Sequence, residues 1–324
     1  MFGAQQWANN KAAVPHHIVY KSDEGAILSN MSLQALLMQL LSGLSGGMLI
    51  YLIAVGLSLI FGTLRVLNLA HGAIYMLGAY LCVWLTSSLK PIPGMFWWAL
   101  VLGPFLVALF GGLVETVLLR RIYRWHFMYQ FILTFALILI ISDSVKLLWG
   151  GGFRSITYPW PLDGSIKVAG GTFPLYNIFL VAVGVSIFFG LRALLHFTRL
   201  GKVIRGITYN REIMSALGEN VPAVYTEVFM LGCWLGGFGG ALATPLVTVS
   251  LGMDMAVIIQ CFIVVVIGGL GSLTGAFIGS LILGLLDAFG IMVLPQLTIA
   301  FGFILMAVIL IVRPYGLLGK REYE

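Results

Sequence analysis

Long apolar runs separated by short polar segments make up most of this chain from residue 33 onward. A helix needs about 20 mainly apolar residues to cross the roughly 30 Å hydrocarbon core of a bilayer. Nine runs approach or meet that length, so the pattern predicts an all-α, polytopic bundle of transmembrane helices. The predicted spans are 33–62, 66–89, 95–119, 127–148, 175–197, 224–249, 254–270, 275–294 and 296–312.

The composition agrees with a membrane protein and excludes an ordinary soluble domain. Hydrophobic residues make up 60% of the chain and charged residues 9%, whereas soluble domains have about 25% charged residues. The three cysteines, Cys82, Cys233 and Cys261, lie within apolar runs. Their positions predict neither a disulfide framework nor a metal site.

The polar segments divide the chain into predicted regions. Residues 1–32 form a polar N-terminal extension without the apolar run of a cleavable signal peptide. Residues 33–318 form the transmembrane domain, and 319–324 form a short tail. Within the domain, the loop 198–223 is polar and basic, too long for a turn and too charged to cross lipid. We therefore expect this loop to bind a partner.

The lysines and arginines predict the orientation of the spans. If the C-terminus is cytoplasmic, twelve of the 18 basic residues fall on the cytoplasmic side, close to the ends of spans. Cytoplasmic loops carry this excess in membrane proteins, so we expect the C-terminus inside and, with nine spans, the N-terminus outside. The net charge of +6 is explained in this way, and no nucleic-acid partner is expected.

A polar stripe interrupts the second predicted span, in the sequence RVLNLAHGAIYMLGAY at 65–80. On a continuous helix, Asn68, His71, Gly72 and Tyr75 lie on or beside one face. Polar groups inside a membrane are unfavourable and often functional. These four residues are therefore candidates for the path of a substrate.

Two other interpretations of this stripe stay open. If the chain is unwound before Asn68, that residue caps a half-helix that begins near Leu69, and the free N–H groups of such an end attract carboxylates. Alternatively, Asn68 and His71 only link neighbouring helices by hydrogen bonds. Asp287 is a fifth candidate for the path, because it lies in the middle of a span; alternatively, it pairs with a neighbouring hydroxyl or backbone amide.

Glycines recur at intervals of four in two places. Residues four apart lie on one helix face, and the absence of side chains lets two backbones approach closely. The pattern favours helix packing; the alternative is a substrate path or a moving contact between helices. The glycines are Gly232, Gly236, Gly240, Gly271, Gly275 and Gly279.

Sequence motifs for catalysis are missing. The chain has no G-x-x-x-x-G-K-[ST] phosphate loop, no H-E-x-x-H and no G-x-S-x-G. We therefore expect no enzymatic activity, no metal and no cofactor in this chain. Active transport then requires either an ion gradient or a separate ATPase.

Three stretches resemble one family of membrane proteins. Residues 40–80, with the Asn68 to Gly72 core, are similar to the first conserved block of LivH-type permeases, the membrane subunits of ABC importers for branched-chain amino acids and related solutes. Residues 267–289 resemble the second block, although Asp287 stands where many relatives carry Glu and Thr274 where they often carry Pro. The loop 198–223 resembles the cytoplasmic coupling region. The resemblance covers roughly residues 35–318.

The resemblance implies several partners. They are a second, LivM-like permease subunit (or a second copy of this one), two cytoplasmic ATPase subunits that bind ATP and Mg²⁺, and a periplasmic or extracellular substrate-binding protein. It also implies a multi-pass protein of the bacterial inner membrane that imports a small amino acid, amide or carboxylate solute.

The coupling loop then predicts a short helix that docks on an ATPase. A polar residue caps its start, apolar residues insert into a groove of the partner, and a glycine ends the helix in a left-handed conformation. The alternative is a merely solvated basic loop. The predicted coupling residues are Thr208, Asn210, Arg211, Glu212, Ile213, Met214, Leu217 and Gly218.

Two other classes of function remain open. A self-contained secondary transporter or channel for a small polar solute would need an ion-coupling carboxylate, for which Asp287 is the mid-span candidate. A membrane-embedded enzyme would need a catalytic pair of side chains that the sequence does not offer.

Overall fold

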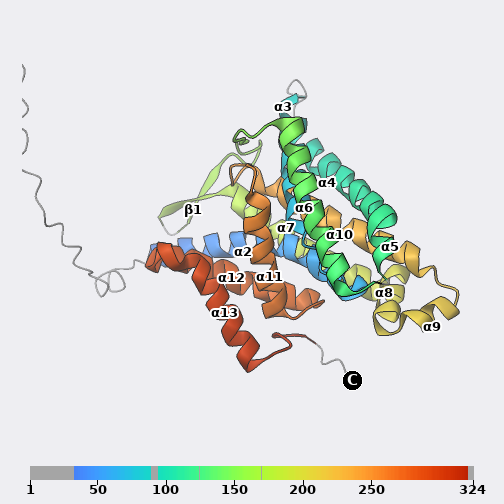
Figure 1. The fold of residues 1–324 in the computed structure, drawn as a ribbon. Coiled ribbons are helices and arrows are strands. Elements are labelled where there is room, and N and C mark those ends of the chain that lie inside the picture. Colours follow the sequence, from blue (N-terminus) through green and yellow to red (C-terminus); the bar gives the residue numbers. More distant parts are fainter. Residues whose placement is uncertain (1–32, 89–93, 124, 169, 320–324) are drawn as a thin grey trace, which may run out of the picture.

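The computed structural model describes residues 33–88, 94–123, 125–168 and 170–319. The predicted extension 1–32 and residues 320–324 of the predicted tail lie outside the described residues. Most of the described chain is helical (Figure 1). The helices are α2 (Leu33–Leu64), α3 (His71–Ser88), α4 (Met95–Val114), the π-helix η1 (Glu115–Leu119), α5 (Arg120–Ile122), α6 (Phe127–Trp149), α7 (Leu175–Phe197), α8 (Arg199–Tyr209), α9 (Arg211–Ala216), α10 (Val221–Ala243), α11 (Met253–Gly268), α12 (Leu273–Val293), the 3-10 helix η2 (Pro295–Leu297) and α13 (Thr298–Val312).

The prediction of a polytopic helical membrane protein is confirmed at this level. Within the described residues, seven helical segments are long and apolar enough to cross a bilayer. Helix α3 is less apolar and α11 is shorter, and neither belongs to these seven. Each of the nine predicted spans coincides with a helix, but the count of nine spans and the orientation stay predictions. The seven segments are α2, α4 to α5, α6, α7, α10, α12 and η2 to α13.

The structure corrects the predicted architecture in three places. Residues 65–70 and 244–249 are not helical, so the second and sixth spans are shorter than expected. The third correction concerns the connection between α6 and α7, where strands β1 (Ser165–Val168) and β2 (Gly171–Pro174) pair as an antiparallel hairpin. The fold is therefore mainly helical rather than all-α.

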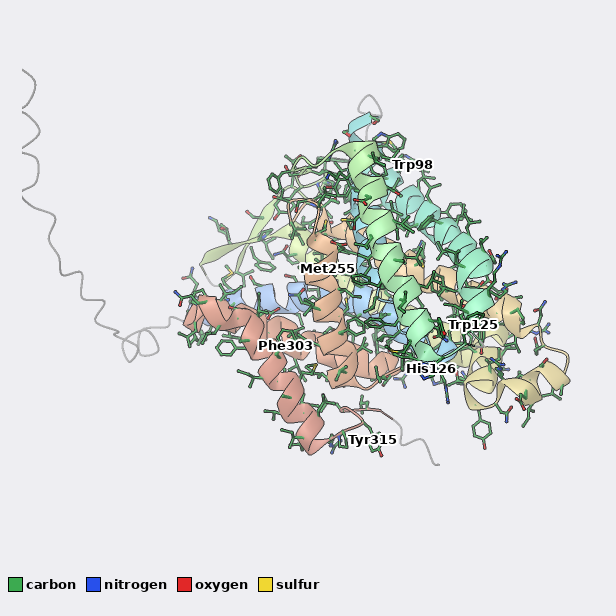
Figure 2. All side chains as sticks on the ribbon, viewed as in Figure 1. Trp98, Trp125, His126, Met255, Phe303 and Tyr315 are labelled. Atoms are coloured by element: carbon green, nitrogen blue, oxygen red, sulfur yellow. The ribbon has the colours of Figure 1, made fainter. Side chains whose placement is uncertain are left out.

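Helices α2 and α10 form the centre of the bundle. Helix α2 packs against α10 and α12, and α10 also packs against α3 and α4. Tyr51, Leu52 and Ile60 of α2 are fully buried. The outer helices α6, α7 and α13 instead expose large apolar side chains, such as Phe303 of α13 (Figure 2), as helices that face lipid do.

The predicted glycines lie at helix contacts. A Cβ on Gly232 would lie 2.6 Å from the Ile60 side chain, and a Cβ on Gly240 would lie 2.0 Å from the Tyr75 carbonyl oxygen. These two and Gly236 bring α10 against α2 and α3. Gly275 and Gly279 likewise face the backbone of α11, at Gly268 and Val264.

Gly271 differs from the other five predicted packing glycines because it lies in the turn between α11 and α12. Its φ of +78° is in the left-handed region that favours glycine. A Cβ on Gly271 would lie 2.8 Å from the Cα of Gly62 near the end of α2. This glycine therefore serves both a turn and a close backbone approach.

The connecting segments gather at opposite ends of the bundle. Helices α8 and α9 stand at one end, and the β1–β2 hairpin lies on the other side (Figure 1). Thr208 of α8 donates to the carbonyl oxygen of Gly62 over 3.4 Å, which places α8 beside the end of α2. The predicted coupling loop thus lies at the end of the bundle where α2 stops.

Candidate functional site

The chain between α2 and α3 breaks its helical conformation inside the bundle. Helix α2 ends at Leu64, Arg65 has a φ of +55°, and α3 begins only at His71. The interpretation of Asn68 to Tyr75 as part of one continuous helix was therefore wrong. The alternative of an unwound segment before a half-helix agrees with the structure, although the helix begins two residues later than expected.

Asn68 does not cap α3 with its side chain. Its amide is buried, and neither Oδ1 nor Nδ2 has a hydrogen-bond partner in the part of the chain that the structure describes. Its backbone carbonyl oxygen accepts the N–H of His71 over 3.2 Å. The Asn68 side chain therefore lies at the start of α3 as an unpaired polar group.

His71 connects α3 to α2. Its ring is fully buried, and Nε2 donates to the carbonyl oxygen of Ile53 over 2.9 Å. A Cβ on Gly56 or on Gly236 would lie 3.0 Å from the ring. Glycines on two neighbouring helices thus make room for this imidazole, which fits the interpretation of His71 as a link between helices.

The other path candidates lie near α11 and α12. Gly72 faces the first turn of α11, and Tyr75 is buried in the same cluster as Ile258 of α11. Asp287 is half-buried and accepts from the Gln260 amide nitrogen over 3.4 Å. The described contacts of Asp287 include none of the α3 candidates, so the structure does not bring all five residues together.

Helix α9 begins at an asparagine cap. Asn210 Oδ1 accepts the backbone N–H groups of Glu212 and Ile213 over 2.9 and 3.0 Å. Thr208, the alternative cap, lies inside α8 and donates to the Ile204 carbonyl oxygen instead. The structure therefore selects Asn210 as the residue that starts α9.

Helix α9 ends in a left-handed glycine. Gly218 has a φ of +86°. Its N–H donates to the Ser215 carbonyl oxygen, and the N–H of Glu219 donates to that of Met214, both over 3.1 Å. This pair of bonds defines a Schellman motif, so the predicted left-handed end of α9 is present.

The side chains of α9 divide between two directions. Ile213 and Leu217 lie about one turn apart and are 54% and 72% exposed. Met214 is partly buried, and a Cβ on Gly206 of α8 would lie 2.5 Å from its sulfur atom. The structure thus corrects the prediction for Met214, which packs against α8 rather than facing outward.

The polar face of α9 borders a cavity. Arg211 and Glu212 are exposed and line a space of about 420 Å³ between α9, α5 and α10. Tyr123 and Tyr225 form the opposite wall with edge-to-face ring packing. Helix α9 is thus a short, capped element with an exposed apolar pair and a cavity beside its polar face.

The comparison with protein families identifies this architecture. The profile described as "branched-chain amino acid transport system / permease component" matches residues 39–313. The chain belongs to this permease family. The match runs from α2 to the residue after α13, so the break before α3 and the capped α9 both lie inside it.

Individual relatives match over nearly their whole length. The high-affinity branched-chain amino acid transport system permease protein BraD of Pseudomonas aeruginosa is 28% identical over 308 residues, which cover 89% of this chain and 97% of that protein. The corresponding permease protein LivH of Escherichia coli K12 is 25% identical over 307 residues, with the same two coverages. A probable LivH permease of Methanocaldococcus jannaschii is 25% identical over 293 residues, covering 84% and 89%. No solved structure matches this chain.

Two buried carboxylates in this permease were not singled out by the sequence as functional. Asp254 in the first turn of α11 is 4% exposed and accepts from the Ser142 hydroxyl over 3.0 Å. Glu115 is fully buried at the start of η1. An acidic residue two positions after Gly252 was the available signal for Asp254, because acids favour the first turn of a helix.

Glu115 organises a cluster that joins α4 to α10. Its oxygens accept from Arg120 and from Tyr123 Oη, both over 3.1 Å, and from Thr226 Oγ1 over 2.6 Å. Burial and the adjacent Glu115 carboxylate raise the pKa of Tyr123 above its ordinary value. The phenol therefore stays protonated and donates to Glu115 at any physiological pH.

Removing the charge of Glu115 should destabilise the protein. In Glu115→Gln, one face of the amide is a donor and cannot accept the bonds of Arg120, Tyr123 and Thr226 together. We expect a loss of about 1–3 kcal/mol of stability, seen as a lower melting temperature of the detergent-purified protein. Asp143→Asn, the same change at an exposed site, is the control. Equal melting temperatures for the two variants would contradict a stabilising role for the cluster.

Proposed function

We propose that this chain is the transmembrane permease subunit of an ABC importer, driven by separate ATPase subunits and fed by an external binding protein. The family match over residues 39–313 carries the proposal. The geometry of α9 supports it, because Asn210 and Gly218 hold an exposed pair, Ile213 and Leu217, at one end of the bundle. A groove on a partner that accepts this pair would move α9 when the partner closes.

The proposed assembly has partners on both sides of the membrane. Two ATPase subunits in the cytoplasm bind ATP and Mg²⁺, a second LivM-like permease subunit completes the membrane part, and a binding protein delivers the solute from outside. This chain itself holds no cofactor and carries out no catalysis. We place it in the bacterial inner membrane with nine spans, the N-terminus outside and the C-terminus in the cytoplasm.

The proposed solute is a small amino acid, amide or carboxylate. BraD and LivH are named branched-chain amino acid permease proteins, which makes leucine, isoleucine and valine the first solutes to test. The break before α3 lies within the proposed path, where Asn68, His71, Gly72 and Tyr75 gather near the start of that helix.

Co-purification tests the proposal. An affinity tag on this chain should isolate the two ATPase subunits from a strain that expresses the whole transport system. The double variant Ile213→Ser/Leu217→Ser should lose them, because it removes the exposed apolar pair of α9. Phe189→Ser, at an exposed apolar position of α7, is the control and should keep them. A tagged chain that never carries an ATPase would contradict the proposal.

The secondary-transporter alternative makes the opposite prediction at Asp287. An ion-coupled carrier would depend on a mid-membrane carboxylate, so Asp287→Asn would abolish uptake. In an ATP-driven permease, the contact with Gln260 is only one helix–helix hydrogen bond, and we expect Asp287→Asn to keep at least half of the ATP-driven uptake. Radiolabelled uptake in whole cells distinguishes the two outcomes.

A further inference from the structure

The first turns of α3 and α11 meet inside the bundle. A Cβ on Gly72 would lie 2.3 Å from the carbonyl oxygen of Asp254. His71 touches Gly236 of α10, and Asp254 is bound by Ser142 of α6. At 1.5 Å per residue, Gly236 and Ser142 each lie about 10 Å from the C-terminal end of their helices. Two helix N-termini thus converge within the membrane rather than at its surface.

The start of α3 presents hydrogen-bond donors that lack acceptors. The N–H groups of His71 and Ile74 bond to carbonyl oxygens of the preceding segment. Those of Gly72 and Ala73 have no partner among the described residues, and the first turn of α3 contains no acidic residue. This end of the helix therefore carries its partial positive charge without compensation.

Buried side chains at the same end are also unpaired. Asn68 is 1% exposed, and neither polar atom of its side-chain amide has a partner within the described ranges. Nδ1 of the fully buried His71 has none there either. A buried polar group without a partner costs about 1–3 kcal/mol. The Asn68 amide nitrogen and the free backbone N–H groups are donors that match the acceptor-rich surface of a carboxylate. Nδ1 of His71 is an acceptor, because Nε2 carries the ring proton and donates to Ile53.

Asp254, whose backbone carbonyl oxygen faces Gly72, carries the opposite charge. Among the described residues it has one side-chain partner, the Ser142 hydroxyl, and no lysine or arginine forms an ion pair with it. The first turn of α11 offsets part of this charge, but a buried carboxylate whose one described side-chain partner is neutral lacks a counter-ion. An ammonium group is the partner that would compensate it most fully.

We propose that the junction of α3 and α11 is a transit site for an α-amino acid zwitterion, with the solute's carboxylate at the start of α3 and its ammonium group at Asp254. The proposal rests on the proposed permease function and narrows its solute class to molecules with both charges. Apolar neighbours, Tyr75 and Ile258, border the junction and suit an aliphatic side chain. Because Gly72 packs directly on α11, the site is closed here, and the two first turns must separate to admit solute.

Binding of radiolabelled leucine to the purified complex tests the proposal. The complex of permease and ATPase subunits is used without its binding protein, so that selection by the binding protein does not contribute. Unlabelled leucine should displace the label, whereas leucinamide, which lacks the carboxylate, and 4-methylpentanoate, which lacks the ammonium group, should compete at least tenfold more weakly. Equal competition by the three compounds, or no leucine binding, would overturn the proposal.

A variant tests whether Asp254 binds the ammonium group of the solute. In Asp254→Asn, leucine binding should weaken at least tenfold, and the advantage of leucine over 4-methylpentanoate should fall below twofold, because the amide no longer favours an ammonium group. Glu227→Gln, which neutralises an exposed acid of α10, should leave both values unchanged. A purely structural role for Asp254 would change the amount of folded complex but not the ratio between the two ligands.

The outcomes separate this proposal from the proposed function. If no ATPase co-purifies, the permease function fails. If the complex assembles and takes up leucine but Asp254→Asn binds it normally, only the transit site fails. If Asp254→Asn does not assemble, the competition series on the unaltered complex and the variant Ser142→Ala still test the transit site. Ser142→Ala should change the affinity for leucine two- to fivefold in either direction. An unchanged affinity would count against the site.

Discussion

Valine in place of Gly218 is expected to reduce ATP-driven uptake at least tenfold while the level of the protein in the membrane stays unchanged. Gly218 has a φ of +86°, which a β-branched residue adopts only with strain. The substitution forces the chain out of the left-handed conformation and breaks the two bonds that end α9. Leu217, which precedes it, then no longer projects as one half of the exposed pair.

The control for this variant is another open glycine. Gly164 also has nothing within 4 Å of a Cβ position, but its φ is not in the left-handed region, and it lies in the loop that carries the β-hairpin. Gly164→Val should therefore transport normally. The measurement is the number of solute molecules transported per ATP hydrolysed. A normal ratio in Gly218→Val would show that the geometry of α9 does not matter for coupling.

Leucine in place of Gly240 is expected to remove most of the folded protein. A Cβ at this position would lie 2.0 Å from the Tyr75 carbonyl oxygen and 3.0 Å from the Ala79 nitrogen, both backbone atoms of α3. Backbone inside a packed helix pair cannot move aside as a flexible side chain does. Helices α3 and α10 would have to move apart, and His71 would shift with α3.

Size-exclusion chromatography of a fluorescent fusion measures this effect. We expect the monodisperse peak of Gly240→Leu to fall at least tenfold relative to the unaltered protein. Gly46→Leu in α2, where a Cβ meets nothing within 4 Å, should keep most of its peak. A full peak from Gly240→Leu would mean that α3 and α10 do not pack as described.

Local chemistry made α9 predictable from the sequence. Asn210 and Gly218 act on backbone groups within three to five residues, so their effect depends little on the rest of the fold. The direction of Met214 was not predictable in this way. It depends on Gly206 of the preceding helix, which leaves the space that the methionine occupies.

Hydrophobic pattern located every long helix but not the break before α3. The residues around the break, Val66 to Ala70, are nearly as apolar as a span, and a hydropathy pattern does not distinguish helix from buried irregular backbone. Such backbone is tolerated at membrane depth only where protein surrounds it. That condition is tertiary. In this chain Val66, Asn68 and Ala70 are buried, and Thr134 of α6 donates to the Leu67 carbonyl oxygen over 3.5 Å.

The candidate residues in the membrane were predictable singly rather than as a group. Asn68 and His71 stood out because polar residues are rare in spans, and the structure places both at the start of α3. Asp254 did not stand out, because its proposed role depends on contacts with Gly72 and Ser142, which are far from it in the sequence. Contacts between distant segments decide which polar residues act together.

Uptake into proteoliposomes tests the central claim, that this chain is a passive gate worked by separate ATPases. The chain is reconstituted alone and together with its permease, ATPase and binding-protein partners, and leucine uptake is measured with ATP inside or outside the vesicles and with proton or sodium gradients imposed. We expect uptake only by the full complex and only with ATP on the side of the ATPase subunits. Ionophores should not affect this uptake. Gradient-driven accumulation of leucine by the chain alone would contradict it.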